Sequence, residues 1–342
     1  MSDRVASGPI CPKACLAIAL VVLATPGSAA ETWLHPVLPQ SVVKAASPPP
    51  RRGARPPRPA APGFPFPTAF SGDSSFVELT TGDRYPEPRN AVPPERIDRT
   101  FVRLGAGRPM PLTSAKVDGP MTRLEATWAG QGLATLGVLL APEARTVEAA
   151  EFEAFLREAG ATAALAERTK KKETKKAARI VTTESARAFA GLVEPRRSAA
   201  AADPAAGIDE PLGLPLEIVA GVPPLPLRAG ASLVATVLLE GRPAPGALVR
   251  VYAPGSDAPS AVSADPHGSV ALTLENEGRY LIAASAVRRT EKADRSRGEA
   301  WKKADWEVRR TTLELLVLPK APEPTPAPTP KAKRSPPKAK TG

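Results

Sequence analysis

The sequence predicts a mainly β protein with two β-sandwich domains, which a short α-helical segment joins and disordered Pro-rich segments flank. Three observations support this fold class. Short apolar runs of strand length recur behind Gly and Pro residues, one stretch changes to a helical period, and many of the 42 prolines gather in two segments that hold few apolar residues. The 342 residues are enough for two domains of ordinary size and their linkers.

Residues 1–30 have the order of a secretory signal peptide. A weakly basic start precedes the apolar run 14–24, and small residues follow at Ser28 and Ala30. The apolar run is shorter than the ~20 residues that a membrane-spanning helix needs. We expect cleavage after Ala29 or Ala30 and a periplasmic or extracellular protein; an uncleaved signal anchor is the alternative. No other stretch of the sequence is apolar enough to predict a membrane span.

The two cysteines, Cys11 and Cys15, both lie inside the predicted signal peptide. The mature chain would therefore hold no thiol, which excludes disulfides and cysteine-ligated metals. A lipoprotein anchor would need a cysteine at the cleavage point, and none stands there.

Two segments lack the composition of a folded domain. A mature N-terminal segment, 31–47, leads into a Pro/Arg-rich linker, 48–71, and the chain ends in a Pro/Lys-rich tail, 319–342. Proline removes backbone donors, and few apolar residues are present to form a core, so both segments are predicted to be extended and disordered. The tail holds much of the net charge of +11 and could attach to anionic polymers of the envelope.

Residues 72–142 predict the first β-sandwich-like domain. Runs of strand length at 76–79, 97–104, 123–128 and 133–140 are separated by glycine-containing turns.

Residues 143–212 predict a helical connector. Phe152, Phe155, Leu156 and Ala159 follow the helical spacing. More helix is expected at 161–178 and 184–192. The lysine-rich run at 170–176 favours a solvated face over a nucleic-acid site, because no aromatic residue interleaves it for stacking.

Residues 213–318 predict the second β-sandwich domain. Alternating apolar residues mark strands at 233–239 and 270–274, and the tetrad Asp265-Pro-His-Gly268 predicts a turn. Two further strands are expected at 280–287 and 306–318. The basic stretch 288–304 between them is long for a hairpin and predicts an excursion of the chain.

Several motifs together resemble one protein family. In chain order they are Trp33-Leu-His-Pro, Glu151-Phe-Glu-Ala-Phe-Leu-Arg-Glu-Ala-Gly, Leu212-Gly-Leu-Pro-Leu-Glu-Ile, Gly241-Arg-Pro, Asp265-Pro-His-Gly, Gly278-Arg-Tyr and Ala304-Asp-Trp-Glu. Their order is similar to that of the periplasmic domain-of-unknown-function 4198 family, whose members are often described as accessory components of nickel or cobalt uptake. The second domain also resembles prealbumin-like and carboxypeptidase-regulatory sandwiches, and the sandwiches are expected to be immunoglobulin-like or prealbumin-like.

The resemblance implies nickel or cobalt as the bound metal, and only His35 and His267 could supply imidazole ligands. Family members commonly begin their mature chain with a histidine, an acidic residue and a tryptophan, whereas here the terminal histidine is absent. Glu31, Asp265 and Asp305 could complete a metal shell if the fold brought them together. The alternative is that both histidines are simply exposed, one near a terminus and one in a turn.

Enzymatic functions are not predicted, and no catalytic residue is assigned. The sequence holds no G-x-S-x-G, H-E-x-x-H or phosphate-binding glycine motif. Three tryptophans raise the alternative of carbohydrate stacking. Trp306 is expected in the core beside Val308, whereas Trp301 in the basic stretch is expected to be exposed, and Trp128 is the third.

These observations predict an exported, non-enzymatic binding or accessory protein of the cell envelope, linked to nickel or cobalt uptake as the resemblance implies. The alternative is an envelope adhesion or polysaccharide-binding module. The expected partners are envelope components or a membrane transporter, and anionic polymers at the basic tail; nucleic acid is not expected.

Overall fold

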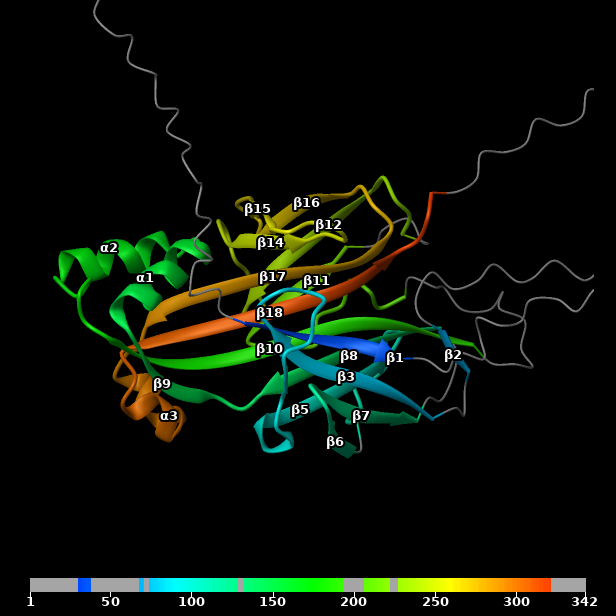
Figure 1. Cartoon of the computed structure of the whole chain (residues 1–342), viewed down its shortest axis with the longest axis horizontal. Helices are drawn as coiled ribbons and strands as arrows, with labels where there is room; N and C mark the ends of the chain where they lie inside the picture. The colour runs from blue at the N-terminus through cyan, green and yellow to red at the C-terminus, as the bar shows by residue number, and fades with distance from the viewer. Residues whose placement is uncertain are drawn as a thin grey trace, which may run out of the picture.

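A computed structural model describes residues 30–37, 68–70, 74–112, 114–127, 132–193, 206–221 and 227–320 (Figure 1). Residues 1–29 of the predicted signal peptide, most of the Pro/Arg-rich linker and most of the tail lie outside these residues. Within them the chain is mainly β, as predicted, and its strands form three sheets. None of the described helices has the length and apolarity to cross a membrane.

The first sheet contains the start of the described chain. Its strands are antiparallel, in the order β1-β3-β7-β6, and β4 adds to β3. The bounds are β1 (Glu31–Val37), β3 (Ser74–Gly82), β4 (Asn90–Ala91), β6 (Ser114–Asp118) and β7 (Met121–Thr127).

The second sheet is mixed and is the centre of the molecule (Figure 1). Its order is β15-β14-β17-β18-β10-β8-β5, and β2 and β9 also pair with β10. β10 runs parallel to β18 and antiparallel to β8. The bounds are β2 (Thr68–Phe70), β5 (Ile97–Leu104), β8 (Gly132–Leu140), β9 (Glu143–Val147), β10 (Ala178–Val193), β14 (Leu248–Tyr252), β15 (Ser260–Ser263), β17 (Gly278–Arg289) and β18 (Trp306–Val317).

The third sheet covers one part of the central sheet. It consists of β11 (Leu216–Ala220), β12 (Ala231–Leu239), β13 (Arg242–Pro243) and β16 (Ser269–Leu274). Leu233 and Leu272 of this sheet pack with Val249, Ile282 and Leu313 of the central sheet in one buried apolar cluster. The strands at 233–239 and 270–274 are thus confirmed, and their alternation reflects one face against this core.

The first sheet covers another part of the central sheet. Leu34, Val77 and Leu124 pack against Leu136 and Ala188 in a second apolar cluster. The central sheet therefore supplies a layer to both cores. The structure confirms the β class and the packing of sheets, but it does not confirm the immunoglobulin-like or prealbumin-like form of the sandwiches.

Two helices cap one end of the central sheet. α1 (Ala149–Glu158) and α2 (Thr162–Lys170) follow β9, and Phe152 and Leu156 of α1 pack against Trp306 of β18. Phe152 and Trp306 have ring centroids 5.9 Å apart. The predicted helix at 152–159 is confirmed, and the core position of Trp306 is confirmed as well.

The expected helix at 184–192 is wrong, because these residues belong to β10. β10 lies between β18 and β8, and both of its faces are covered, so the consecutive residues Ala186, Arg187, Ala188 and Phe189 are all buried. A strand buried on both faces loses the alternation that identifies a strand in a sequence. Apolar residues at helical spacing in the same run then favoured the wrong element.

The expected exposure of Trp301 is also wrong. The basic stretch folds into a short 3-10 helix, η4 (Ala293–Arg297), and α3 (Glu299–Lys302), which turn the Trp301 side chain inward to 7% exposure. The guanidinium of Arg297 lies over the ring, 4.4 Å from its centroid. Trp301 therefore offers no platform for a sugar, and Trp128 lies outside the described residues.

Candidate functional site

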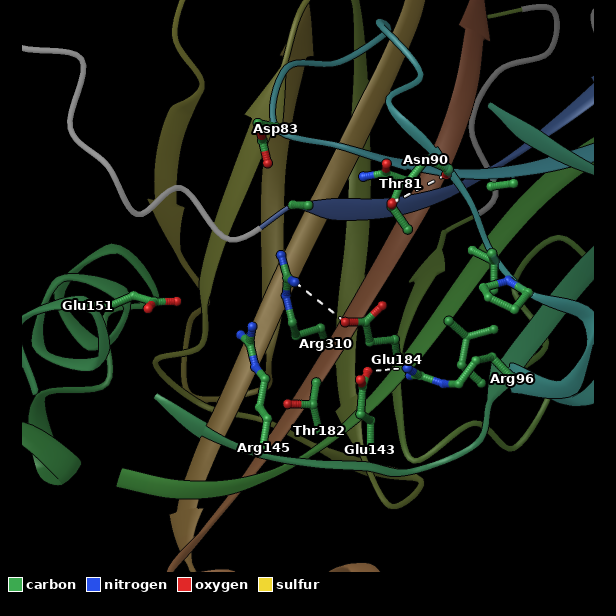
Figure 2. A pocket seen from close by; sticks show the side chains of 15 residues that line it. Thr81, Asp83, Asn90, Arg96, Glu143, Arg145, Glu151, Thr182, Glu184 and Arg310 are labelled. Carbon is green, nitrogen blue, oxygen red and sulfur yellow. Dashed lines mark hydrogen bonds and ion pairs between the residues drawn. The ribbon is translucent and has the colours of Figure 1, made fainter. Parts of the chain in front are cut away.

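A polar cavity of about 580 Å³ opens at the start of β1, where the first sheet, α1 and the central sheet meet (Figure 2). It is lined mainly by charged and hydroxyl side chains. Those labelled in the figure are Thr81, Asp83, Asn90, Arg96, Glu143, Arg145, Glu151, Thr182, Glu184 and Arg310.

Strand pairing brings the central residues of this cavity together. Thr182 and Glu184 are two residues apart on β10 and point to one face of the sheet. β9 pairs with β10 so that Glu143 lies opposite Thr182, with Arg145 two residues further along. On the other side of β10, the parallel register places Arg310 of β18 opposite Glu184.

A buried ionic network forms the floor of the cavity. The Arg310 guanidinium lies 3.1 Å from Oε2 of Glu31 and 3.5 Å from Oε1 of Glu184. Arg250 of β14 pairs with both Glu31 and Glu158. The hydroxyl of Thr32 donates to Oε2 of Glu184 at 2.5 Å. The network thus ties β1 to α1, β10, β14 and β18.

Burial and neighbouring charges shift the pKa values of ionisable groups in this network. Burial, followed by the nearby charge of Glu31, raises the pKa of Glu158 against the opposing effect of Arg250. The pKa of Tyr252 is raised for the same two reasons, burial and the Glu31 carboxylate. Burial alone would lower the pKa of Arg310, but the carboxylates of Glu31 and Glu184 raise it on balance.

Three groups in the cavity have no partner among the described residues. Arg145 and Glu151 take part in no hydrogen bond or ion pair there, and the buried hydroxyl of Thr182 has no hydrogen-bond partner. Figure 2 shows Glu151 reaching in from α1 and Arg145 rising from β9 toward Arg310. An unmade hydrogen bond at a buried hydroxyl is costly, so an oxygen from a bound molecule would stabilise this arrangement.

The predicted metal ligand His35 lies elsewhere, on β1 in a separate charged cluster. Its Nδ1 is 2.7 Å from Oε1 of Glu314 and 2.9 Å from Nη1 of Arg279. His35 is half-buried, and burial, followed by the nearby charge of Glu314, raises the pKa of the Tyr85 phenol.

The other predicted ligand, His267, is in the exposed turn before β16. Its backbone N–H donates to Oδ1 of Asp265 at 2.8 Å, and the N–H of Ser269 donates to the same oxygen at 2.8 Å. These bonds lower the pKa of Asp265, that from Ser269 most. The predicted turn at 265–268 is confirmed, and His267 is one of its exposed members.

The three carboxylates proposed to complete a metal shell have other partners. Glu31 pairs with Arg250 and Arg310, Asp305 forms two hydrogen bonds with Arg179, and Asp265 caps its own turn. Across the described ranges, no three residues among His, Cys, Asp and Glu are placed to hold a metal ion.

No local sequence pattern singled out the residues that line the cavity. Glu151 was noted only as part of a helix motif. The polar alternation of Thr182 and Glu184 would have been a signal, but it requires that residues 184–192 be recognised as strand. Arg310 reaches the cavity because β18 pairs in parallel with β10, and more than a hundred residues of sequence separate these two strands. No local sequence pattern encodes such a pairing.

Comparisons with known proteins identify a family but no function. A family model described as "Domain of unknown function (DUF4198)" matches residues 87–288. No curated protein is significantly similar to the chain. Among solved structures, a mutant of Salmonella alpha-2-macroglobulin matches with 10% identity over 73% of this chain and 14% of that chain, at a TM-score of 0.19. Dimeric latent PorU from Porphyromonas gingivalis matches with 11% identity over 71% of this chain and 19% of that chain, at a TM-score of 0.15. This chain thus spans less than a fifth of either structure, and both TM-scores are too low to support a fold assignment.

Proposed function

Because this chain belongs to the DUF4198 family of domains of unknown function, we propose its function from the cavity itself: it is an exported, non-enzymatic protein that binds a small polar ligand with a carboxylate group. The observation that carries the proposal is the guanidinium of Arg145 beside the buried hydroxyl of Thr182, because neither group has a partner among the described residues.

These two groups suit a carboxylate. A guanidinium donates two parallel hydrogen bonds to a carboxylate, and these bonds are shorter and stronger than neutral ones. The Thr182 hydroxyl can donate one further bond to the same group. Arg310 already forms an ion pair with Glu184. Among the described residues, Arg145 is therefore the arginine of the cavity wall that remains available to bind a ligand.

The opposite wall suits a second polar group on the same ligand. Glu151 points inward from α1 and can accept hydrogen bonds from an ammonium or a hydroxyl (Figure 2). Amino acids and sugar acids carry both kinds of group. The volume of about 580 Å³ lies in the usual range of roughly 300–1,000 Å³ for small-molecule sites.

A binding screen tests the proposal. The chain from Ala30 onward is mixed with amino acids, sugar acids and uncharged sugars, and thermal shift and calorimetry are recorded. We expect a member of the first two classes to bind and Arg145→Gln to weaken it at least tenfold. Arg242→Gln is the matched control, because Arg242 is exposed and lies outside the cavity. The proposal fails if nothing in the screen binds more tightly than about 1 mM, or if Arg145→Gln binds as well as the wild type.

The role in nickel or cobalt uptake remains a separate proposal, supported by the family resemblance. At His35, the Arg279 guanidinium lies 2.9 Å from Nδ1 and would repel a cation on that side of the ring. Calorimetric titration of Ni²⁺ and Co²⁺ against the wild type, His35→Ala and His267→Ala tests it. Saturable binding that either substitution abolishes would favour the metal, and binding that ignores both would remove it.

Under either role we expect the partner to be an envelope component or a membrane transporter that receives the ligand. The basic tail would add attachment to anionic polymers. Sedimentation with envelope preparations, with and without residues 319–342, separates that attachment from binding in the cavity. Equal sedimentation of the two forms at low salt would show that the tail is not needed.

A further inference from the structure

The ionic network under the cavity is not balanced in charge. Glu31, Glu158 and Glu184 face two guanidiniums, those of Arg250 and Arg310. The Glu31, Arg250 and Arg310 side chains are all less than one-tenth exposed, so water screens them little. A buried charge without a partner of opposite sign is strongly destabilising. The excess negative charge of this network therefore calls for a further cation nearby.

The other charged groups of the wall do not supply that cation. Arg96 pairs with Glu143, and Arg89 pairs with Asp83. Arg145 and Glu151 have no partners among the described residues, and their opposite charges add to zero. One negative charge therefore remains in excess among the described groups around the cavity, and the raised pKa of Glu158 is in keeping with it.

The start of β1 lies at this point. Ala30 is half-buried and lines the cavity, and the next residue, Glu31, belongs to the network through both of its carboxylate oxygens. The sequence immediately before Ala30 is the predicted signal-peptide exit, with the small residues Ala29 and Gly27 at the first and third positions before the bond between Ala29 and Ala30.

We propose that the chain is cleaved between Ala29 and Ala30 and that the new α-ammonium group of Ala30 is the missing cation of the cavity. A signal endopeptidase would hydrolyse this bond with one water molecule. The C–N bond breaks, Ala29 keeps a carboxylate, and Ala30 gains an amine, which takes up a proton near neutral pH. Cleavage one residue later would remove Ala30 from the cavity wall.

This proposal rests on the proposed function and adds a regulation to it. In the precursor, position 30 contributes an uncharged amide to the wall. After processing it contributes a positive charge at neutral pH, directly before β1 and next to Glu31. A carboxylate ligand should therefore bind the processed chain more tightly than the precursor, which would restrict binding to the exported protein.

Two measurements test the proposal. The intact gene is expressed with export, and the mass of the purified protein gives its first residue, which we expect to be Ala30. In parallel, two forms are made with defined first residues: one starts at Ala30, and the other starts at Ser28 and keeps two native residues as a matched extension. We expect the Ala30 form to melt several degrees higher at pH 7, and this advantage to shrink above about pH 9, when the amine loses its proton. We also expect at least threefold tighter binding of the ligand identified by the screen.

The outcomes separate this proposal from the proposed function. If the exported protein starts at another residue, or if the two forms are equal in melting temperature and affinity, the role of Ala30 is refuted while ligand binding stands. If no ligand binds but the Ala30 form keeps its pH-dependent stability advantage, ligand binding fails and the role of the α-ammonium group stands.

Discussion

Arg187 and Glu217 form an ion pair in which each side chain is only 1% exposed, with Nη1 2.8 Å from Oε1. Glu217 also accepts hydrogen bonds from the backbone amides of residues 212–214. Arg187 donates in turn to the carbonyls of Ile208 and Glu210. Burial lowers the pKa of Arg187 to about 10. The pair therefore fastens the segment before β11 to the middle of β10, and it gives the Leu212-Gly-Leu-Pro-Leu-Glu-Ile motif a structural role.

Replacement of Glu217 should destabilise the fold strongly. Glu217→Gln removes the charge opposite Arg187 and leaves a buried guanidinium without an anion, so we expect a loss of about 3–5 kcal/mol in the free energy of unfolding. Urea denaturation measures it. Glu277→Gln is the control, because Glu277 is exposed and makes no ion pair among the described residues, and its change should stay within about 0.5 kcal/mol. A loss below about 1 kcal/mol for Glu217→Gln would contradict the importance of the pair.

Gly268, which ends the confirmed turn at 265–268, allows a test of steric fit. Its φ is +73°, and a Cβ there would lie 2.8 Å from the amide nitrogen of Ala244 and 2.9 Å from the carbonyl oxygen of Val237. Gly246 has a similar φ of +70° but nothing within 4 Å of a Cβ. We expect Gly246→Ala to cost about 1 kcal/mol from backbone strain alone and Gly268→Ala about 2 kcal/mol more. Equal melting temperatures for the two variants would show that the turn relaxes freely.

Local sequence patterns predicted the elements that have one solvent face. The helix at 152–159 has one buried stripe, the strand at 233–239 has one buried face, and both are where the patterns placed them. The turn at Asp265 was predictable because its carboxylate and Gly268 act within five residues. In each of these cases the cause of the structure lies in neighbouring residues.

The elements that depend on distant contacts could not be predicted in this way. β10 is covered on both faces, and its Arg187 looks like a solvent residue until Glu217 is placed beside it. The cavity needs Arg310, Thr182 and Glu31 from three strands, and only the assembled sheets bring these strands together. Trp301 was expected outside because the residues around it are basic, yet Arg297 lies over its ring and covers it.

The burial of Trp301 makes a quantitative prediction. Trp301→Ala should lower the free energy of unfolding by about 3–5 kcal/mol, because it leaves a large cavity beneath α3 and removes the contact with Arg297. Urea denaturation followed by circular dichroism measures it. Trp301→Phe should recover about half of this loss, since most of the apolar volume returns. A loss below about 1 kcal/mol, together with weakened binding to polysaccharide, would instead return Trp301 to the surface role that the sequence suggested.

The carboxylate of Asp294 should make stability depend on acid pH. It accepts hydrogen bonds at 2.7 Å from both Nη atoms of Arg288 and at 2.8 Å from the amide of Glu291, and the bonds from Arg288 chiefly lower its pKa below the ordinary value. A carboxyl group whose pKa is depressed in the folded state stabilises the fold above its unfolded pKa of about 3.9 and loses that contribution as the pH falls. We therefore expect the free energy of unfolding to decrease from pH 5 to pH 2.5. The Asp294→Asn variant should flatten this decrease and should cost about 1.5–3 kcal/mol at pH 7.

Asp209→Asn is the control, because Asp209 is exposed and unpaired among the described residues, and it should leave the slope unchanged. A slope in Asp294→Asn as steep as in the wild type would assign the acid sensitivity to other carboxylates.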